Sequence, residues 1–235
     1  MGLQQRLRTL HRFLVQHAFY ALALSSALAC GILTVRVARI HRESYIFLVW
    51  NLLLAWMPYL WSLWASAIQR CHPRDWWRLL VPGALWLLFF PNAPYIVTDF
   101  VHLRELWPVP LWYDIGMLAS FALSGCFLAV VSLQTMQRLV RQLCGGVVSW
   151  LFVGVSVGLS GLGVYLGRFQ RWNSWDVLLY PRDVLADAVR PILYPLSHLH
   201  PLGASAMFAA ILLICYVMFI SVAPGNSSIA VPAEK

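Results

Sequence analysis

The stretch Phe-Phe-Pro-Asn-Ala-Pro-Tyr-Ile-Val-Thr-Asp-Phe-Val-His-Leu, residues 89–103, decides how this chain is expected to fold. It begins as the end of an apolar run and ends as a mixed run that contains Tyr, Thr, Asp and His. Pro91 and Pro94 lack the amide hydrogen that a helix interior needs, and each pushes the residue before it towards extended geometry. We therefore predict a membrane-spanning helix that breaks here and restarts, with Asn92 as the N-cap of the restarted segment.

After the second proline, polar residues recur at helical spacing. Tyr95, Asp99 and His102 stand at positions i, i+4 and i+7. Thr98 and Glu105 stand beside them, and at 3.6 residues per turn the five fall within about 120° of arc. The pattern predicts a helix with a polar stripe, held at a membrane boundary.

The composition indicates a membrane protein. Hydrophobic residues make up 60% of the 235 residues, charged residues only 11%, and the mean hydropathy is +0.70. Soluble domains have about a quarter of their residues charged. Crossing the hydrocarbon takes about 20 mostly apolar residues. We predict an all-α fold, a polytopic transmembrane helical bundle whose third span is broken at the Pro-Asn-Ala-Pro segment. Six segments are long enough to span: about 15–35, 45–68, 77–97, 111–133, 147–167 and 202–223.

Short loops between these spans leave no room for a soluble domain. We expect residues 1–14 to form a basic interfacial lead-in, residues 15–223 a single transmembrane helical domain, and residues 224–235 a disordered tail. Lys and Arg are almost equally divided between the two sides of the membrane, so the positive-inside rule does not orient the chain. The arginines before the first span favour cytoplasmic termini.

Charge and cysteine usage limit the class of partner. The five cysteines form no Cys-x-x-Cys pair, which predicts neither a disulfide framework nor a cysteine zinc site. The net charge of +8 is spread over the loops without a long basic run. This favours contact with the lipid bilayer and predicts no nucleic-acid partner.

A second motif follows the glycine-rich fifth span. In that span Gly154 and Gly158 stand four apart, which predicts close helix packing. The motif Tyr-Leu-Gly-Arg-Phe-Gln-Arg-Trp-Asn-Ser-Trp-Asp occupies residues 165–176. Asn173 or Ser174 is expected to cap the short helix that follows, with an aspartate in its first turn.

The segments 91–99 and 167–176, together with Trp50-Asn51 and the stretch 112–114, resemble a known bacterial family. It is the set of multi-pass membrane proteins of domain-of-unknown-function family 1361. The resemblance extends over about residues 45–220. It implies an integral protein of the bacterial cytoplasmic (inner) membrane and places both motifs and Asp114 on one membrane face. It brings no established activity, substrate or cofactor, so the cofactor stays unknown.

An enzymatic interpretation takes Asp99 and His102 as metal ligands, with Asp114 or Asp176 completing the site. Carboxylate and imidazole ligands suit Zn, Mn or Fe, and the metal would activate water or polarise a phosphoryl oxygen. Under this interpretation the protein would be a hydrolase or transferase that acts on a lipid headgroup or phosphate ester. These four residues are the catalytic candidates.

The ligand-binding candidates surround them. Two arginines sharing a helix face would hold an anionic lipid headgroup or a small anionic ligand by bidentate contacts. Amide, hydroxyl and aromatic side chains of the two motifs would contribute the rest. The candidates are Asn92, Tyr95, Thr98, Arg168, Arg171, Trp172 and Asn173.

Two other interpretations stay open. In a transporter of a small ligand or ion, the start of the helix at residues 92–95 would point its positive dipole end at a cavity. In a non-catalytic scaffold, Asp99, Asp114 and Asp176 would only fasten segments to the bundle. Their expected partners are Arg104, Arg168 and Arg171.

Overall fold

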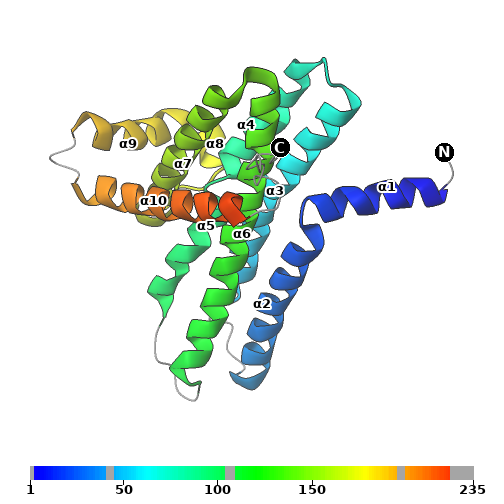
Figure 1. Cartoon of the computed structure of the whole chain (residues 1–235). Coiled ribbons are helices and arrows are strands. Elements are labelled where there is room, and N and C mark those ends of the chain that lie inside the picture. Colours follow the sequence, from blue (N-terminus) through cyan, green and yellow to red (C-terminus); the bar gives the residue numbers. More distant parts are fainter. Residues whose placement is uncertain (1–2, 41–44, 104–108, 195–198, 223–235) are drawn as a thin grey trace, which may run out of the picture.

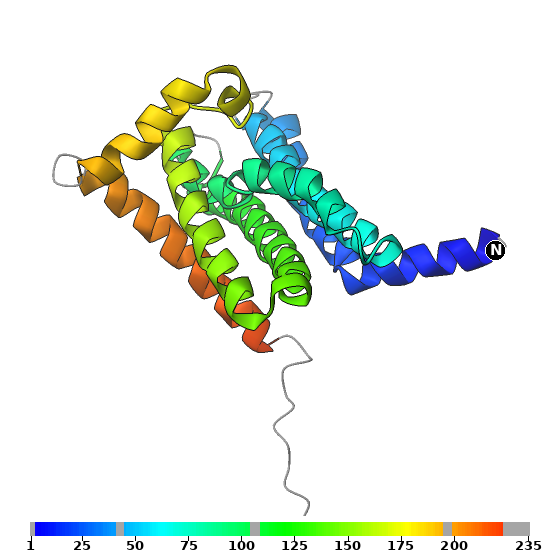
Figure 2. The same cartoon turned by 90° about the horizontal axis from the view of Figure 1, so that it is seen from above.

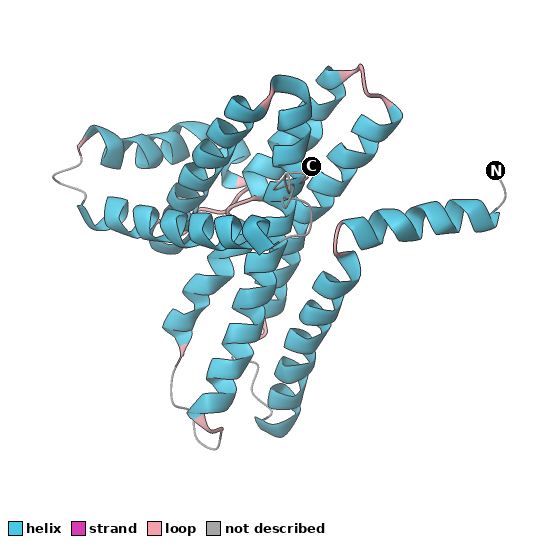
Figure 3. Cartoon of the chain, viewed as in Figure 1, coloured by secondary structure: helices cyan, strands magenta, loops and turns pink. Residues whose placement is uncertain are grey.

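The structure is a computed structural model that describes residues 3–40, 45–103, 109–194 and 199–222. All regular structure in these ranges is helical (Figure 3). Six helical segments are long and apolar enough to cross a membrane, so the predicted polytopic helical bundle is confirmed. In chain order the helices are α1 Leu3–Gln16, α2 Phe19–Ile40, α3 Phe47–Cys71, η1 Trp76–Leu79, α4 Leu80–Phe89, α5 Asn92–Tyr95, η2 Ile96–His102, α6 Leu111–Cys144, α7 Gly146–Phe169, α8 Asp176–Leu179, α9 Pro181–Leu193 and α10 Leu199–Val222.

Helix α6 is the central element of the bundle (Figure 1). It contacts α2, α3, the broken span, α7 and α10, and its inner side chains, such as Phe121 and Leu128, are completely buried. At 34 residues it is longer than the predicted span of 111–133. The predicted loop 134–146 is therefore mostly helix, because polar residues such as Arg138 continue the α-helix beyond the apolar run. Gly145, with φ of 87°, ends it.

The third span is interrupted where the prolines predict it, but its backbone geometry differs from the prediction. Phe90 has φ −55° and ψ −38°, and Pro91 has φ −60° and ψ −24°. The expected extended geometry before Pro91 is therefore wrong, and the chain keeps a helical path. The prolines interrupt the hydrogen-bond pattern instead, because they have no N–H to donate. The span divides into α4, the four-residue α5 and the 3₁₀-helix η2.

Asn92 is not the N-cap of α5. That position is Pro91, and no side chain caps the helix. Asn92 instead donates its Nδ2 hydrogens to the Phe89 carbonyl oxygen, 3.0 Å away, and to Ser174 Oγ, 2.8 Å away. The side chain thus provides a hydrogen-bond donor for a carbonyl oxygen at the end of α4 and links the 171–175 loop to the break.

Glycines allow three close approaches. A Cβ on Gly125 of α6 would lie 2.5 Å from the Ala93 carbonyl oxygen, and one on Gly163 of α7 would lie 2.6 Å from Pro91 Cγ. Gly161 packs on the α10 backbone at Ser205, and α7 and α10 lie side by side in both views (Figures 1 and 2). Gly154 and Gly158, predicted to mediate packing, face open space.

Helix α1 projects away from the bundle (Figures 1 and 2). Its arginines are exposed, and so are Leu7 and Leu10 on its apolar stripe, at 56% and 53%. The elbow to α2 turns at Ala18, which has φ of 57°. This geometry suits a helix at the headgroups, but the interfacial role of residues 1–14 stays a prediction. The predicted disordered tail, 224–235, lies outside the described residues.

His17 fixes this elbow. The side chain is 9% exposed, its Nδ1 lies 2.8 Å from the Phe13 carbonyl oxygen, and its Nε2 lies 3.3 Å from Ser66 Oγ. The Tyr59 hydroxyl donates to the His17 carbonyl oxygen at 2.9 Å. Neutral imidazole satisfies both ring contacts, with Nδ1–H donating and Nε2 accepting.

The elbow should weaken in acid. Burial, and then the nearby charges of Arg70 and Arg138, lower the pKa of His17 below its ordinary 6.5. The unfolded chain therefore binds a proton at a pH where the folded chain does not, so the contribution of His17 to stability is present above about pH 6.5 and lost as the pH falls below it. The thermal unfolding midpoint of detergent-purified protein, measured from pH 8 to pH 5, should fall less steeply in H17Q. H11Q changes an exposed histidine of α1, and its unfolding midpoint should depend on pH as that of wild type does. An equal pH dependence in wild type and H17Q would show that His17 does not cause the loss of stability in acid.

Candidate functional site

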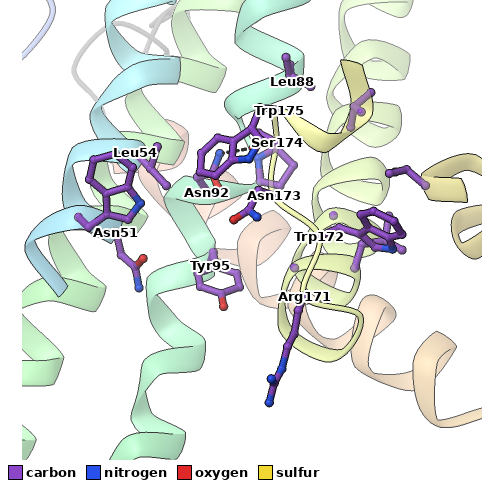
Figure 4. A pocket seen from close by; sticks show the side chains of 17 residues that line it. Asn51, Leu54, Leu88, Asn92, Tyr95, Arg171, Trp172, Asn173, Ser174 and Trp175 are labelled. Atoms are coloured by element: carbon purple, nitrogen blue, oxygen red, sulfur yellow. Dashed lines mark hydrogen bonds between the residues drawn. The ribbon is translucent and has the colours of Figure 1, made fainter. Parts of the chain in front are cut away.

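A cavity of about 340 Å³ lies at the break in the third span (Figure 4). Four parts of the chain surround it: the first half of α3, the junction of α4 and α5, the C-terminal half of α7, and the stretch from the end of α7 into the first turn of α9. The lining residues are Trp50, Asn51, Leu54, Leu88, Pro91, Asn92, Tyr95, Gly163, Leu166, Gly167, Arg171, Trp172, Asn173, Ser174, Trp175, Val177 and Val184.

The shape of the cavity depends on small residues of α7 and on a tight turn after it. A Cβ on Gly167 would come within 3.2 Å of the Tyr95 ring, so α7 approaches the break closely. Arg171 then adopts φ of 61°, a left-handed conformation that is unusual for a residue with a side chain. The turn brings the loop back over the cavity, where Trp172 Nε1 donates to Asp187 Oδ2 of α9 at 2.9 Å.

Five of the seven ligand-binding candidates line this cavity: Asn92, Tyr95, Arg171, Trp172 and Asn173. The other two do not. The Thr98 hydroxyl donates to the Tyr95 carbonyl oxygen at 2.7 Å, and Arg168 lies beside η2. Sequence reasoning missed the contributions of Trp50, Leu54 and Leu88, whose apolar character alone did not distinguish them from other span residues.

Asp99 and His102 share one arginine. Because η2 has about three residues per turn, these side chains lie on one face. Arg168 Nη1 is 3.8 Å from Asp99 Oδ1, and Arg168 Nη2 is 3.2 Å from His102 Nε2. The other carboxylate oxygen of Asp99, which is 1% exposed, accepts a 2.8 Å hydrogen bond from Asn51 Nδ2. A cationic guanidinium therefore stands where the metal interpretation expects an ion.

Asp114 has a different partner from those predicted. It accepts two hydrogen bonds from Arg36, of 2.6 and 2.9 Å, and both side chains are 1% exposed. The Arg36 guanidinium also lies 4.4 Å from the centre of the Tyr45 ring, and the Tyr45 hydroxyl donates to the His102 carbonyl oxygen at 2.9 Å. Asp114 thus joins the Asp99 group only indirectly. The sequence interpretation missed Arg36 because it treated this residue as a loop charge.

Asp176 does not complete a metal site either. Its Oδ2 accepts from the backbone N of Asn173 at 2.7 Å and from Asn173 Nδ2 at 3.2 Å. The predicted cap by Asn173 or Ser174 is wrong, since no side chain caps α8. Within the described ranges, no three His, Cys, Asp or Glu side chains lie close enough to hold one metal ion. Arg104, a predicted partner of these aspartates, lies outside those ranges.

The start of α5 offers few free amides for an anion. The Ala93 N–H donates to the Phe90 carbonyl oxygen and the Tyr95 N–H donates to that of Pro91, both at 3.2 Å. Pro94 has no N–H at all. The anion site predicted at residues 92–95 for a transporter is therefore not formed by the backbone of this short helix.

The pair of Asp114 and Arg36 should be critical for stability. D114A would leave the Arg36 charge buried without its partner, which typically costs about 3–5 kcal/mol. We expect a large drop in the thermal unfolding midpoint of the purified protein. D183N removes an exposed carboxylate of α9 and should leave the midpoint near that of wild type. An unchanged midpoint in D114A would show that the pair is not needed for stability.

Comparison with known proteins places the chain at the level of a family. Neither the curated proteins nor the solved structures give a match. A family model described as "Protein of unknown function (DUF1361)" matches residues 50–221. This region contains the break, the 171–175 loop and every residue that lines the cavity, whereas α1, α2 and Arg36 precede it. The chain therefore belongs to the DUF1361 family of proteins of unknown function.

Proposed function

We propose that this integral membrane protein binds the phosphate-bearing headgroup of a lipid in the cavity at the broken third span. The observation that carries the proposal is the mixed lining of the cavity. Apolar side chains of spanning helices line it together with one cation and several amides.

The charge of the cavity favours an anion. Among the described residues, Arg171 is the only charged residue that lines it. In Figure 4 its side chain points downwards, away from the other labelled residues, so its guanidinium lies at the rim of the cavity. An arginine guanidinium matches phosphate geometry with paired hydrogen bonds.

The apolar side chains of the cavity favour a ligand with a hydrocarbon part. Trp50 is 54% exposed, and Leu54 and Leu88 are half-buried on the membrane-spanning helices α3 and α4. Side chains exposed on a spanning helix meet acyl chains. A phosphate held by Arg171 would therefore lie next to its own lipid tail.

The depth of the cavity fits a headgroup. Helix α9 carries Arg182, Asp183, Asp187 and Arg190, while its Val184 packs inwards and lines the cavity. A short helix with one charged face and one apolar face typically lies in the headgroup layer. The cavity beside it is then at the same depth.

Hydrolysis or transfer of the headgroup, the activity expected from the sequence, has weaker support than binding. Asp99 and Asp176 reach the cavity only through the side chains of Asn51 and Asn173, and neither lines it. A catalytic role for Asp99 or His102 would require Arg168 to leave them. We also propose a bacterial inner-membrane location from the family resemblance, and cytoplasmic termini from the arginines of α1.

Removing the cavity cation tests the proposal. Full-length protein in detergent, incubated with phosphatidylglycerol, should retain this lipid in native mass spectrometry. R171Q should retain it about tenfold less, because a charge-assisted hydrogen bond is worth roughly 1.5–3 kcal/mol. R182Q removes an exposed arginine of α9 outside the cavity and should behave as wild type. Equal retention by wild type and R171Q would refute the proposed role of the cavity.

A further inference from the structure

Three asparagines line the cavity, and each has a partner outside it. An asparagine side chain carries two N–H donors on one atom and an acceptor oxygen on the other. When the nitrogen end is bound to one acceptor, the oxygen end and the second N–H remain for other partners. The partners of Asn51, Asn92 and Asn173 therefore decide what the cavity presents.

All three partners are hydrogen-bond acceptors. Asn51 Nδ2 donates to Asp99 Oδ2, and the other carboxylate oxygen of Asp99 lies 3.8 Å from Arg168 Nη1. Asn92 Nδ2 donates to the carbonyl oxygen of Phe89, and Asn173 Nδ2 donates to Asp176 Oδ2. A carbonyl or carboxylate oxygen cannot donate, so the nitrogen end must face each of these partners.

The oxygen end of each asparagine is consequently left over. Among the described residues, no group donates a hydrogen bond to Oδ1 of Asn51, Asn92 or Asn173. Figure 4 shows the oxygens of Asn51 and Asn173 turned towards the space between α3 and the 171–175 loop. The cavity thus contains amide oxygens that receive no hydrogen bond from the described residues, one further N–H on each of Asn51 and Asn173, and Arg171 as its cation.

We infer that the bound headgroup carries its own hydrogen-bond donors, hydroxyl or ammonium N–H groups, beside its phosphate. This inference rests on the proposed headgroup binding and names the kind of headgroup. Phosphatidylethanolamine and phosphatidylglycerol have such donors. Phosphatidylcholine, in which methyl groups replace the ammonium hydrogens, has no donor for these amide oxygens.

Phosphatidylcholine is the sharpest competitor, because the cavity also contains aromatic rings. Trp50, Trp172 and Trp175 line it, and tryptophan rings attract a quaternary ammonium group. If the rings decided selectivity, phosphatidylcholine would bind at least as well as phosphatidylethanolamine. If the amide oxygens decide it, phosphatidylethanolamine binds better.

The inference gives Asp99 and Asp176 the role of positioning residues. Each holds the nitrogen end of an asparagine and so turns the oxygen end to the ligand, without touching the ligand itself. D176N replaces a pure acceptor with an amide that also donates, so Asn173 is no longer held in one orientation. Because Asp176 is the first residue of the four-residue helix α8, which has no buried residue, this change does not alter the bundle core.

The test is a competition on full-length protein in detergent, read by native mass spectrometry. Phosphatidylethanolamine and phosphatidylcholine with identical acyl chains are supplied in equal amounts, with phosphatidylglycerol and phosphatidylcholine in a parallel sample. We expect wild type to retain the two donor-bearing lipids about tenfold over phosphatidylcholine, since a site built to pair with donors rejects a ligand that lacks them. In D176N the ratio of phosphatidylethanolamine to phosphatidylcholine should fall towards one, and in D183N it should stay as in wild type.

The outcomes separate the inference from the proposed function. Equal retention of phosphatidylethanolamine and phosphatidylcholine by wild type would overturn the inference and leave headgroup binding standing. An unchanged ratio of phosphatidylethanolamine to phosphatidylcholine in D176N would show that Asp176 does not position Asn173 for the ligand. Retention of no phospholipid would overturn the proposed function. Displacement by an equal concentration of free glycerophosphoethanolamine would show that the lipid tail contributes nothing and that a soluble headgroup is the ligand.

Discussion

The absence of amide hydrogens at Pro91 and Pro94 is the constraint on which the rest of the structure depends. It leaves carbonyl oxygens at the end of α4 without helical partners, and inside a membrane such groups must be satisfied by the protein. Asn92 supplies one partner to Phe89 and, with its other hydrogen, binds Ser174. The same break that interrupts the span therefore attaches the loop that closes the cavity, and the glycines of α7 provide the room for it.

The sequence predicts the architecture well because membrane helices are specified by length and apolarity. Six spans, an interruption at the proline pair and a meeting of the 91–95 and 171–173 segments all follow from composition and motif. The dihedral angles at the break do not follow, because steric preferences before proline are weak enough for packing to override them. At Phe90, tight packing against Trp86, with ring centres 4.4 Å apart, accompanies the retained helical geometry.

The charged partners are harder to predict, since an ion pair depends on which helices pack together. Asp114 was expected near other motif residues, whereas its partner, Arg36, is 78 positions away along the chain on α2. The sequence predicts Asp99 and Asp176 as catalytic residues. In the structure each instead accepts a hydrogen bond from an asparagine side chain. A sequence shows that buried carboxylates need partners, but not which polar group becomes the partner.

The partnership of Arg36 with Asp114 also bears on what counts as one folding unit. The region matched by the family model begins at residue 50, after α2 has ended. Yet the carboxylate of Asp114, inside that region, is neutralised by a guanidinium that precedes it. A chain restricted to the matched region would carry a bare negative charge in its interior. The boundary of the recognisable family is therefore not the boundary of an electrostatically self-sufficient protein, and α2 supplies the counterion for the bundle that follows it.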